Sequence, residues 1–363
     1  MKISIVAGAR PNFIKIAPLT RAIEQARKEG KDISYRLVYT GTRHDPNIDA
    51  SLFEDLDMPL PDHYLEATGH NLTEQAGAIM MAFTKELEQN PADVVIVVDD
   101  LTSTMACAIA AKRGKAKVAH LVAGTRSFNM DMPKEMNRMI ADGLSDYLFT
   151  AGMVANRNLS QAGTENQHIY FVGNILIDGL RYNHNRLQRP QCYDELKLNE
   201  GQYILLTLNK QSLINDRATL SQMLETIIRE SQGMHVIVPA HKQTRQSIAG
   251  TGIQAANLHI LPPQGYLAFG YLENKAKAII TDSGNLAEEA TFLGIPCITL
   301  DTYTEHPETV ATGTNELVGT DPEKLEEALE RLHKGEWKKG SLPERWDGRT
   351  ADRIVKILLD DFN

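Results

Sequence analysis

Short runs of apolar, β-branched residues alternate with longer segments of helical periodicity along the whole sequence. In the first half the clearest strand candidates are residues 2–7, 35–39, 93–98, 117–122, 146–150 and 169–172. A second series follows at residues 203–207, 235–239, 258–261, 277–281 and 296–300. Near-continuous apolar strands separated by helices are typical of parallel sheets that are covered by helices on both faces. The pattern therefore predicts an α/β fold with two Rossmann-like, doubly wound domains.

The boundary between the two series is predicted in the polar stretch around residues 183–200, which is interrupted by proline. A chain of 363 residues has room for about two domains at roughly 150 residues each. We expect an N-terminal domain over residues 1–180 and a second domain over residues 181–345.

The net charge and the cysteine content argue against some classes of function. The chain carries 38 Lys and Arg against 47 Asp and Glu, a net charge of −9, which argues against a protein that coats nucleic acid. Cys107, Cys192 and Cys297 show no CxxC spacing, and sparse single cysteines favour a reducing compartment. No stretch approaches the ~18 apolar residues of a membrane span, and the first run is too short for the core of a signal peptide. We expect a cytoplasmic protein without nucleic-acid or membrane partners.

Ligands of doubly wound sheets bind beyond the carboxyl ends of the strands, so the residues after each apolar run form the candidate site. After the first run, Arg10 and Lys15 lie near a helix start that Pro11 favours. Two cations at a helix N-terminus favour an anionic ligand; the alternative is that Arg10 pairs with a protein carboxylate. The segment is neither GxGxxG nor a P-loop, so it predicts no dinucleotide or ATP site.

Acidic residues follow the third run, at Asp99 and Asp100. Either of them is suited to cap the next helix, and the other is a candidate acid or base. Further along, Pro133 is expected to start a helix that places Arg138 one turn on from Lys134. Charged side chains at a helix start are often simply solvated, so only their place at the sheet edge makes them candidates.

In the second half, Ser283 and Gly284 follow an apolar strand and predict a backbone nest that opens a helix and suits a pyrophosphate. Glu289 lies about one and a half turns further on, where its carboxylate is placed to contact ribose hydroxyls. The alternative is a serine helix cap without a ligand. His241 also follows a strand, although a single histidine there is more often a packing group. No two histidines have metal-ligand spacing on one helix face, so no metal site is expected.

Taken together, these motifs resemble one family over nearly the whole chain. They are Gly-Ala-Arg-Pro at 8–11, Thr-Ser-Thr-Met-Ala at 102–106, Arg-Ser-Phe-Asn at 126–129, Asn-Arg at 137–138, Phe-Val-Gly-Asn at 171–174, Thr-Asp-Ser-Gly at 281–284, Glu-Glu-Ala at 288–290, Pro-Glu-Thr-Val at 307–310 and Gly-Thr-Asn at 313–315. In their order and number they resemble the non-hydrolysing UDP-N-acetylglucosamine 2-epimerases.

The resemblance implies a GT-B-like pair of Rossmann-type domains that face a central cleft with a UDP-sugar between them. It also implies a C-terminal helix, within residues 346–363, that packs back on the first domain, and a homodimer. In the implied reaction a base removes the sugar C2 proton while UDP leaves C1, and UDP then adds back with C2 inverted. No cofactor takes part. The implied setting is cell-surface polysaccharide biosynthesis.

The resemblance also implies roles for individual residues. The residues that could supply acid–base steps are Asp100, Glu135 and His241, together with Lys134, which departs from the family pattern. Substrate-binding roles fall on Arg10, Lys15, Arg138, Asn209, Lys210, His241, Ser283, Gly284, Glu289 and His306.

Three acid–base positions of the family carry different residues here. Val122 and Lys134 each stand where the family has an acidic residue, and Asn209 replaces a histidine. Valine transfers no proton, and an asparagine amide is neither acid nor base at neutral pH. Lys134 inverts a charge and therefore changes the pKa values of its neighbours.

These residues are compatible with three functions. The first is an enzyme that interconverts UDP-GlcNAc and UDP-ManNAc or performs an altered nucleotide-sugar reaction, in which Lys134 could orient a carboxylate-bearing sugar. The second is a pseudo-epimerase that binds a UDP-sugar without turning it over. The third, a glycosyltransferase-like activity, rests on analogy of fold alone.

Overall fold

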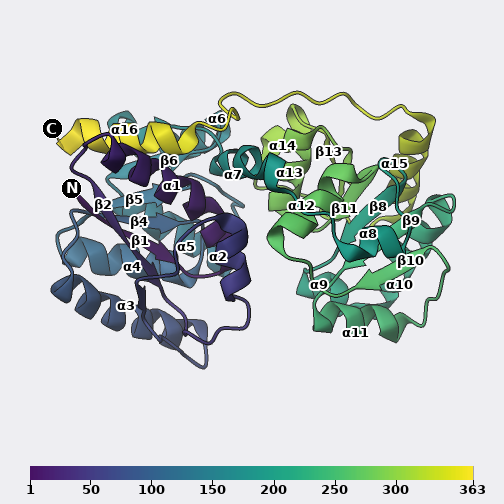
Figure 1. Cartoon of the computed structure of the whole chain (residues 1–363), viewed down its shortest axis with the longest axis horizontal. Coiled ribbons are helices and arrows are strands. Elements are labelled where there is room, and N and C mark those ends of the chain that lie inside the picture. The colour runs from purple at the N-terminus through teal and green to yellow at the C-terminus, as the bar shows by residue number, and fades with distance from the viewer. Residues whose placement is uncertain (363) are drawn as a thin grey trace. The chain divides into compact units, whose positions relative to one another are not determined.

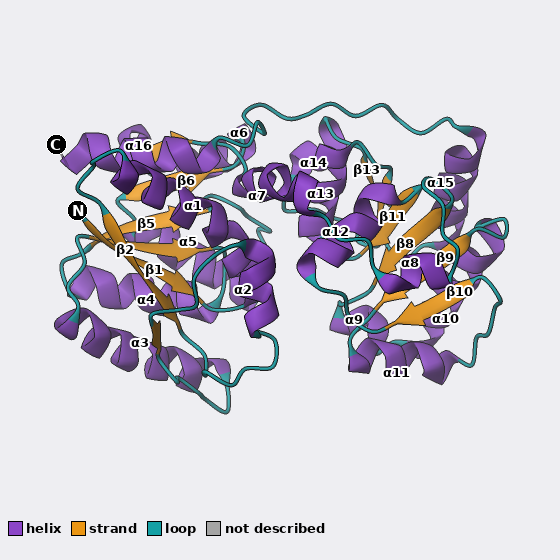
Figure 2. Cartoon of the chain, viewed as in Figure 1, coloured by secondary structure: helices purple, strands orange, loops and turns teal. Residues whose placement is uncertain are grey.

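The computed structural model describes residues 1–362, which form two compact α/β units (Figure 1). The first unit contains residues 1–182 together with the segment that begins at Glu344, and the second runs from Asn183 to Pro343. Each unit has its own parallel sheet with helices around it (Figure 2).

The first unit is built on a seven-stranded parallel sheet with the order β3-β2-β1-β4-β5-β6-β7. Its central strand β4 is buried along its whole length, because helices cover both faces of the sheet. The elements of this unit are β1 (Lys2–Ala7), α1 (Arg10–Lys28), β2 (Ser34–Tyr39), α2 (Ala50–Leu56), β3 (His63–Tyr64), α3 (Leu72–Gln89), β4 (Val94–Val98), α4 (Thr102–Arg113), β5 (Lys117–Leu121), α5 (Pro133–Leu144), β6 (Tyr147–Thr150), α6 (Met153–Gln161), the 3-10 helix η1 (Asn166–His168), β7 (Ile169–Phe171), α7 (Ile175–Asn183) and α16 (Thr350–Phe362).

The second unit is built on a six-stranded parallel sheet with the order β10-β9-β8-β11-β12-β13. Alternate residues of β8 enter two separate apolar cores: Ile204 and Leu206 pack on one face, Tyr203 and Leu205 on the other. The elements are the 3-10 helix η2 (His184–Arg186), α8 (Gln191–Glu195), β8 (Tyr203–Thr207), α9 (Gln211–Ile214), α10 (Arg217–Glu230), β9 (His235–Pro239), α11 (Lys242–Thr251), β10 (Leu258–Leu261), α12 (Tyr266–Lys275), β11 (Ala278–Thr281), α13 (Gly284–Leu293), β12 (Cys297–Thr299), α14 (Pro307–Ala311), β13 (Asn315–Leu317) and α15 (Pro322–Lys334).

The predicted α/β class with two doubly wound parallel sheets is confirmed. All eleven predicted strands are present, and their ends agree with the prediction to within one residue. Sequence reasoning missed β3 and β13, which are two and three residues long and therefore too short to form a recognisable apolar run. Among residues 1–362, no helix is both long and apolar enough to cross a membrane.

The C-terminal helix α16 belongs to the first unit, where it packs against α1 (Figure 1). It begins at Thr350, after an extended segment. The Asp178 carboxylate on α7 accepts hydrogen bonds from the backbone N–H groups of Thr350 (3.1 Å) and Ala351 (2.8 Å). Near the other end of α16, Lys117 Nζ lies 2.6 Å from Asp361 Oδ2. Both ends of the helix are therefore held by the first unit.

Candidate functional site

Each sheet has one point at which the chain reverses its direction of winding. In the first unit this point lies between β1 and β4, and in the second it lies between β8 and β11. Loops that follow the two strands at such a point diverge and leave a crevice at the carboxyl edge, where α/β proteins bind ligands. The predicted site residues Lys15, Asp100, Asn209 and Ser283 follow these four strands.

Asp99 ties the loop after β4 to helix α1. The chain turns here with a φ of 58° at Asp99, and the carboxylate accepts hydrogen bonds from Lys15 Nζ (2.5 Å) and Asn12 Nδ2 (3.0 Å). Asn12 Oδ1 in turn accepts the N–H of Gly8 at 2.9 Å. A side chain at Gly8 would collide with Ser103, since its Cβ would lie 1.9 Å from the Ser103 Oγ. The ammonium group of Lys15 is thus held at the sheet edge.

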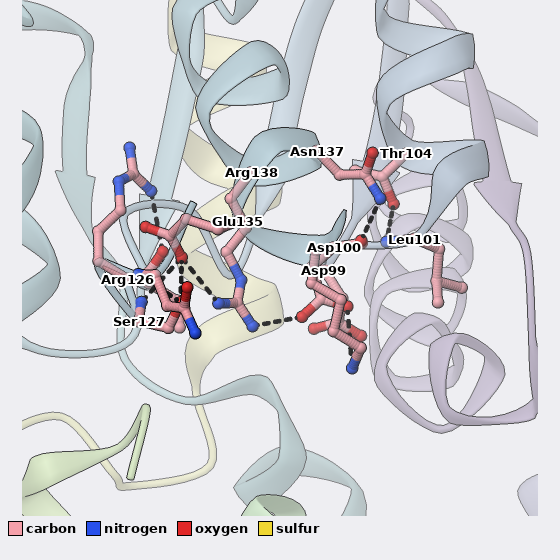
Figure 3. A network of polar contacts seen from close by, with 12 residues as sticks. Asp99, Asp100, Leu101, Thr104, Arg126, Ser127, Glu135, Asn137 and Arg138 are labelled. Carbon is pink, nitrogen blue, oxygen red and sulfur yellow. Dashed lines mark hydrogen bonds and ion pairs between the residues drawn. The ribbon is translucent and has the colours of Figure 1, made fainter. Parts of the chain in front are cut away.

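Asp100 contacts two cations of helix α5, of which Arg138 is seen in Figure 3. Its Oδ2 accepts a hydrogen bond from Arg138 Nη2 at 2.5 Å, and Lys134 Nζ is 3.5 Å from its Oδ1. Burial alone would raise the pKa of Asp100, but the charges of Lys134 and Arg138 outweigh burial and hold this pKa below its ordinary value. Asp100 is therefore a carboxylate at neutral pH, with the half-exposed Lys134 beside it.

Neither Asp99 nor Asp100 caps helix α4, so the capping alternative is wrong. Leu101 occupies the N-cap position and makes no side-chain cap hydrogen bond. The Thr104 hydroxyl serves this helix start instead: it accepts the N–H of Leu101 at 3.2 Å and donates to the Val98 carbonyl at 2.6 Å (Figure 3). Both carboxylates are thereby left to the charged groups of α1 and α5.

Glu135 is an anion that holds the loop after β5. Its Oε2 accepts the N–H and the hydroxyl of Ser127, each at 2.8 Å, and Arg138 Nη1 lies 3.2 Å away, while Oε1 accepts the N–H of Phe128 at 3.2 Å (Figure 3). Burial acts to raise the pKa of Glu135, but the Ser127 and Phe128 donors lower it overall. Since four donors favour its charged form, Glu135 is better suited to fix Arg138 than to exchange protons.

Val122 lies in a left-handed turn directly after β5. Its φ is 68°, a region that is strongly disfavoured for a β-branched residue. Gly124 has a φ of 79°, and a Cβ there would lie 2.6 Å from the Ala155 carbonyl oxygen. The turn therefore has a fixed backbone shape, and Val122 is an unfavourable residue at its position.

A buried cluster behind this turn was missed by sequence reasoning. Asp142 Oδ1 lies 2.6 Å from His120 Nδ1, and Asp142 Oδ2 lies 2.5 Å from Arg126 Nη1. His120 Nε2 is 2.7 Å from the carbonyl oxygen of Asp99. Burial would lower the pKa of His120, but the charge of Asp142 and its hydrogen bond raise it above the ordinary value. The cluster joins the loops after β4 and β5. Asp142 is 22 residues from His120 in sequence, so no local motif could reveal the pair.

In the second unit, Asp282 holds the loop after β8. Its Oδ2 accepts the backbone N–H groups of Asn209 and Lys210, both at 2.7 Å. Lys210 also forms an ion pair with Asp301, which follows β12. The Oδ1 of Asp282 is buried and has no hydrogen-bond partner in the described chain, and burial raises the pKa of this carboxyl. Asn209 itself is exposed.

Helix α13 begins at Gly284, next to His306. Ser283 occupies the N-cap position, as the serine-cap alternative expected, but its side chain makes no cap hydrogen bond. Its N–H donates to the Thr281 hydroxyl at 3.0 Å. A Cβ at Gly284 would lie 3.4 Å from His306 Cδ2, and His306 Nδ1 is 3.1 Å from Glu288 Oε1. The imidazole is thus held against the first turn of the helix.

Three predicted residues lie apart from these clusters. Arg10 is the first residue of α1 and forms no ion pair within residues 1–362. Its charge still contributes to the lowered pKa of Asp49, which the Ser51 hydroxyl mainly causes. His241 is exposed at the N-cap position of α11, and its side chain makes no hydrogen bond to the described residues. Glu289 lies on α13 and interacts with the buried Glu273 of α12. In the part of the chain described, no group of three His, Cys, Asp or Glu side chains is placed to hold a metal ion.

Comparison with known proteins identifies the family of the chain. The family model described as UDP-N-acetylglucosamine 2-epimerase matches residues 25–359, and the chain belongs to this family. UDP-N-acetylglucosamine 2-epimerase from Methanocaldococcus jannaschii is 34% identical over 370 residues, which are 99% of each chain. A crystal structure of that protein in complex with UDP-GlcNAc and UDP superposes with a TM-score of 0.86 and covers 99% of both chains.

A second relative carries a different name. UDP-2,3-diacetamido-2,3-dideoxy-D-glucuronate 2-epimerase from Pseudomonas aeruginosa is 34% identical over 362 residues, again 99% of each chain. A lipopolysaccharide outer-core galactosyltransferase structure is more remote. It superposes with a TM-score of 0.53 and is 16% identical, and the match covers 100% of this chain and 98% of that one. This similarity is evidence of the fold alone. The fold class is the GT-B-like α/β class that was expected from sequence.

Proposed function

We propose that this protein binds a UDP-linked N-acetylhexosamine and inverts its C2 centre. One observation carries the proposal: at the switch point of a chain in this family, Asp100 is ionised and has the Lys134 ammonium 3.5 Å away. A carboxylate and an ammonium are a base and an acid at neutral pH. Together they replace a carboxylate pair as the groups that remove and return a proton.

Nucleotide binding is assigned to the second unit. The first N–H groups of α13, at Gly284 and the residues that follow, suit a pyrophosphate because the positive end of a helix dipole favours anions. Lys210 and His306 lie at the same carboxyl edge and are assigned to the phosphates. Glu289, one and a half turns into α13, is assigned to the ribose hydroxyls. His241 and Asn209 are assigned to uridine or sugar contacts, which their exposure permits.

In the proposed reaction Asp100 takes the proton from C2 while the C1–O bond breaks and UDP leaves with the bonding electrons. The sugar is then a C1=C2 glycal. Lys134 delivers a proton to C2 from the other face, and the UDP oxygen attacks C1. Asp100 is now protonated and Lys134 is neutral, and a proton moving between them restores both groups. Lys15 and Arg138 hold positive charge at the sheet edge, where Arg138 orients Asp100.

A carboxylate with a low pKa is a weak base. The low pKa of Asp100, however, belongs to the state in which Lys134 lies beside it. Lys134 is the strongest of the charges that lower this pKa. A sugar ring that separates Lys134 from Asp100 removes part of this effect and makes the carboxylate a stronger base. Val122 and Asn209 take no part in proton transfer, and Glu135 serves as a positioning residue for Arg138.

A second candidate substrate is a UDP-linked acetamido sugar acid. Lys134 is a half-exposed cation in a position where the family resemblance implies an acidic residue, and a sugar carboxylate is a natural partner for it. The 34% identical relative from Pseudomonas aeruginosa is named for such a uronate. The reaction at C2 is the same for both substrates, so the two candidates differ only in the group at C5.

The test is a comparison of C2 inversion rates among four proteins: wild type, Asp100→Asn, Lys134→Gln and the control Lys112→Gln. Lys112 is a partly exposed lysine that pairs with Asp146 at 2.8 Å, away from the switch point. Removing a positioned acid or base lowers kcat by about 10²–10⁴-fold, so we expect losses of that size for the first two variants and none for the control. UDP affinity, measured by calorimetry, should stay within a few-fold throughout.

Three results would contradict the proposal. Unchanged turnover in Lys134→Gln would remove Lys134 from the reaction. A wild-type protein that binds UDP but converts neither UDP-N-acetylhexosamine nor the corresponding uronate would be a binding protein of the pseudo-epimerase kind. Sugar transfer to an added acceptor with release of UDP would identify a glycosyltransferase instead.

The proposal also includes the oligomeric state of the protein and its place in the cell. The family resemblance supports a homodimer, which sedimentation equilibrium would detect as twice the 40.4 kDa chain mass. The three unpaired cysteines, of which Cys107 and Cys297 are buried, support a reducing, cytoplasmic setting.

A further inference from the structure

Two buried carboxyl groups meet inside the second unit. Glu273 on α12 is 1% exposed, and Glu289 on α13 is 8% exposed. Their side chains are hydrogen-bonded to each other. Two carboxylates do not hydrogen-bond, because each offers only acceptors, so one member of the pair carries a proton.

The surroundings decide which member is protonated. Leu272 and Ala276 on α12 and Ala287 and Ala290 on α13 belong to one apolar cluster around the pair. Burial, together with the charge of Glu289, raises the pKa of Glu273 well above its ordinary value. Glu273 is therefore the neutral, donating carboxyl, and Glu289 is the anion that accepts its hydrogen bond.

Within residues 1–362, Glu289 is the charged group that shifts the pKa of Glu273, while the charge of Lys338 acts on the neighbouring Cys297. The other titratable group beside Glu273 is Cys297 on β12, and burial raises the pKa of that thiol to about 12. Cys297 is thus neutral as well. The Oε1 atom of Glu273 is buried and has no hydrogen-bond partner within residues 1–362, so the hydrogen bonding of this side chain is directed to Glu289.

A buried acid with one unsatisfied oxygen is an expensive choice for an apolar core. A leucine or methionine of similar size would avoid the desolvation cost of the carboxyl group. What the acid adds is a single, directed hydrogen bond to Glu289. Such a hydrogen bond is useful if the orientation of the Glu289 carboxylate matters to the function of this unit.

We propose that Glu273 is a positioning residue of the nucleotide site, whose carboxyl proton fixes the Glu289 carboxylate for the cis-diol of a ribonucleoside diphosphate. This inference rests on the proposed function, because it uses the assignment of Glu289 to the ribose. Glu273 does not touch the nucleotide. Its contribution is to hold one rotamer of Glu289.

The experiment measures the affinities of UDP and 2′-deoxy-UDP by calorimetry, with Glu273→Met, Glu273→Gln, Glu289→Gln and the Glu273→Met/Glu289→Gln double variant. Methionine fills similar space but donates nothing, whereas glutamine keeps a donor toward Glu289. Loss of one hydrogen bond corresponds to about a two- to tenfold change in affinity. We expect Glu273→Met to weaken UDP binding by this factor and to leave 2′-deoxy-UDP binding unchanged. Glu273→Gln should bind both ligands as the wild type does, and the double variant should bind UDP no more weakly than Glu289→Gln.

The outcomes separate this inference from the proposed function. Equal weakening of both ligands by Glu273→Met would mean a general structural role, and no weakening of either would mean no role; each overturns the inference while UDP binding by the wild type stands. Failure of the wild type to bind UDP at all would overturn the proposed function and the ribose role with it.

Denaturation at several pH values provides a readout that does not depend on nucleotide. With its pKa raised, Glu273 holds a proton in the folded state that it loses in the unfolded state above about pH 4.3. Wild-type stability should therefore fall relative to Glu273→Gln as pH rises from there through the folded-state pKa. A stability difference between the two proteins that is constant from pH 4 to pH 9 would contradict protonation of Glu273.

Discussion

Asp99, Asp100 and Glu135 are three carboxylates at one sheet edge, and their partners give them different tasks. Asp99 accepts hydrogen bonds from Lys15 and Asn12, and Glu135 is saturated by four donors. Asp100 alone has a half-exposed cation beside it. The sequence predicted Asp100, Glu135 and Lys134 as candidates, but it could not rank them. The ranking depends on hydrogen bonds from Ser127, in the loop after β5, and from Arg138, which contacts both Asp100 and Glu135.

Val122 provides a test at the scale of a single residue. Its left-handed backbone conformation is strained for a β-branched side chain, at a cost of order 1–3 kcal/mol. Asparagine tolerates this conformation, so we expect Val122→Asn to raise the free energy of unfolding by about 1 kcal/mol, measured by guanidinium denaturation. The control is Lys115→Asn, at an exposed position with a φ of 64° but without β-branching, where the gain should be smaller. A loss of stability in Val122→Asn would show that packing of the valine outweighs its strain.

At the scale of elements, the sequence predicts the strands and the start of α5 well because both depend on local patterns. Pro133 begins α5 as expected, and Lys134 and Arg138 then reach Asp100. The predicted cap of α4 failed for a physical reason. Asp99 turns the chain into the left-handed region, so its side chain and that of Asp100 point to α1 and α5 rather than to the helix that follows.

Contacts between distant elements were not predictable from one sequence. The Asp142–His120 pair and the Glu273–Glu289 pair each join two elements. None of these four residues belongs to a spacing motif with its partner. Only the packing of helices onto strands brings them together.

The start of α16 offers a test of one element. Asp178 accepts two N–H groups there, and removing a helix cap costs about 0.5–2 kcal/mol. We expect Asp178→Ala to lower the stability of the first unit by about that amount and to speed amide exchange in the first turn of α16. Asp352 is an exposed acid in the same turn and serves as the control, because Asp352→Ala loses only the weaker interaction with the helix dipole. Equal effects of the two variants would mean that Asp178 does not act as a cap.

For the whole molecule, the candidate residues divide between the two units. The first unit holds the charged groups assigned to proton transfer, and the second holds the helix start, the histidine and the acid pair assigned to the nucleotide. The family model matches residues 25–359 and therefore includes parts of both units. The fold was predictable because it depends on the local pattern of strands and helices, whereas the exact chemistry depends on side-chain contacts between distant segments.

The central claim is that C2 chemistry persists with Asp100 and Lys134 as its acid–base pair. The most direct measurement is proton NMR of the wild-type protein with UDP-N-acetylglucosamine in deuterated water. We expect the C2 proton signal of the sugar to be lost by exchange with deuterium and a second epimer to appear, since solvent deuterium enters through Asp100 and Lys134. Tight UDP binding with a C2 proton signal that persists in both UDP-N-acetylglucosamine and the corresponding uronate would contradict this claim.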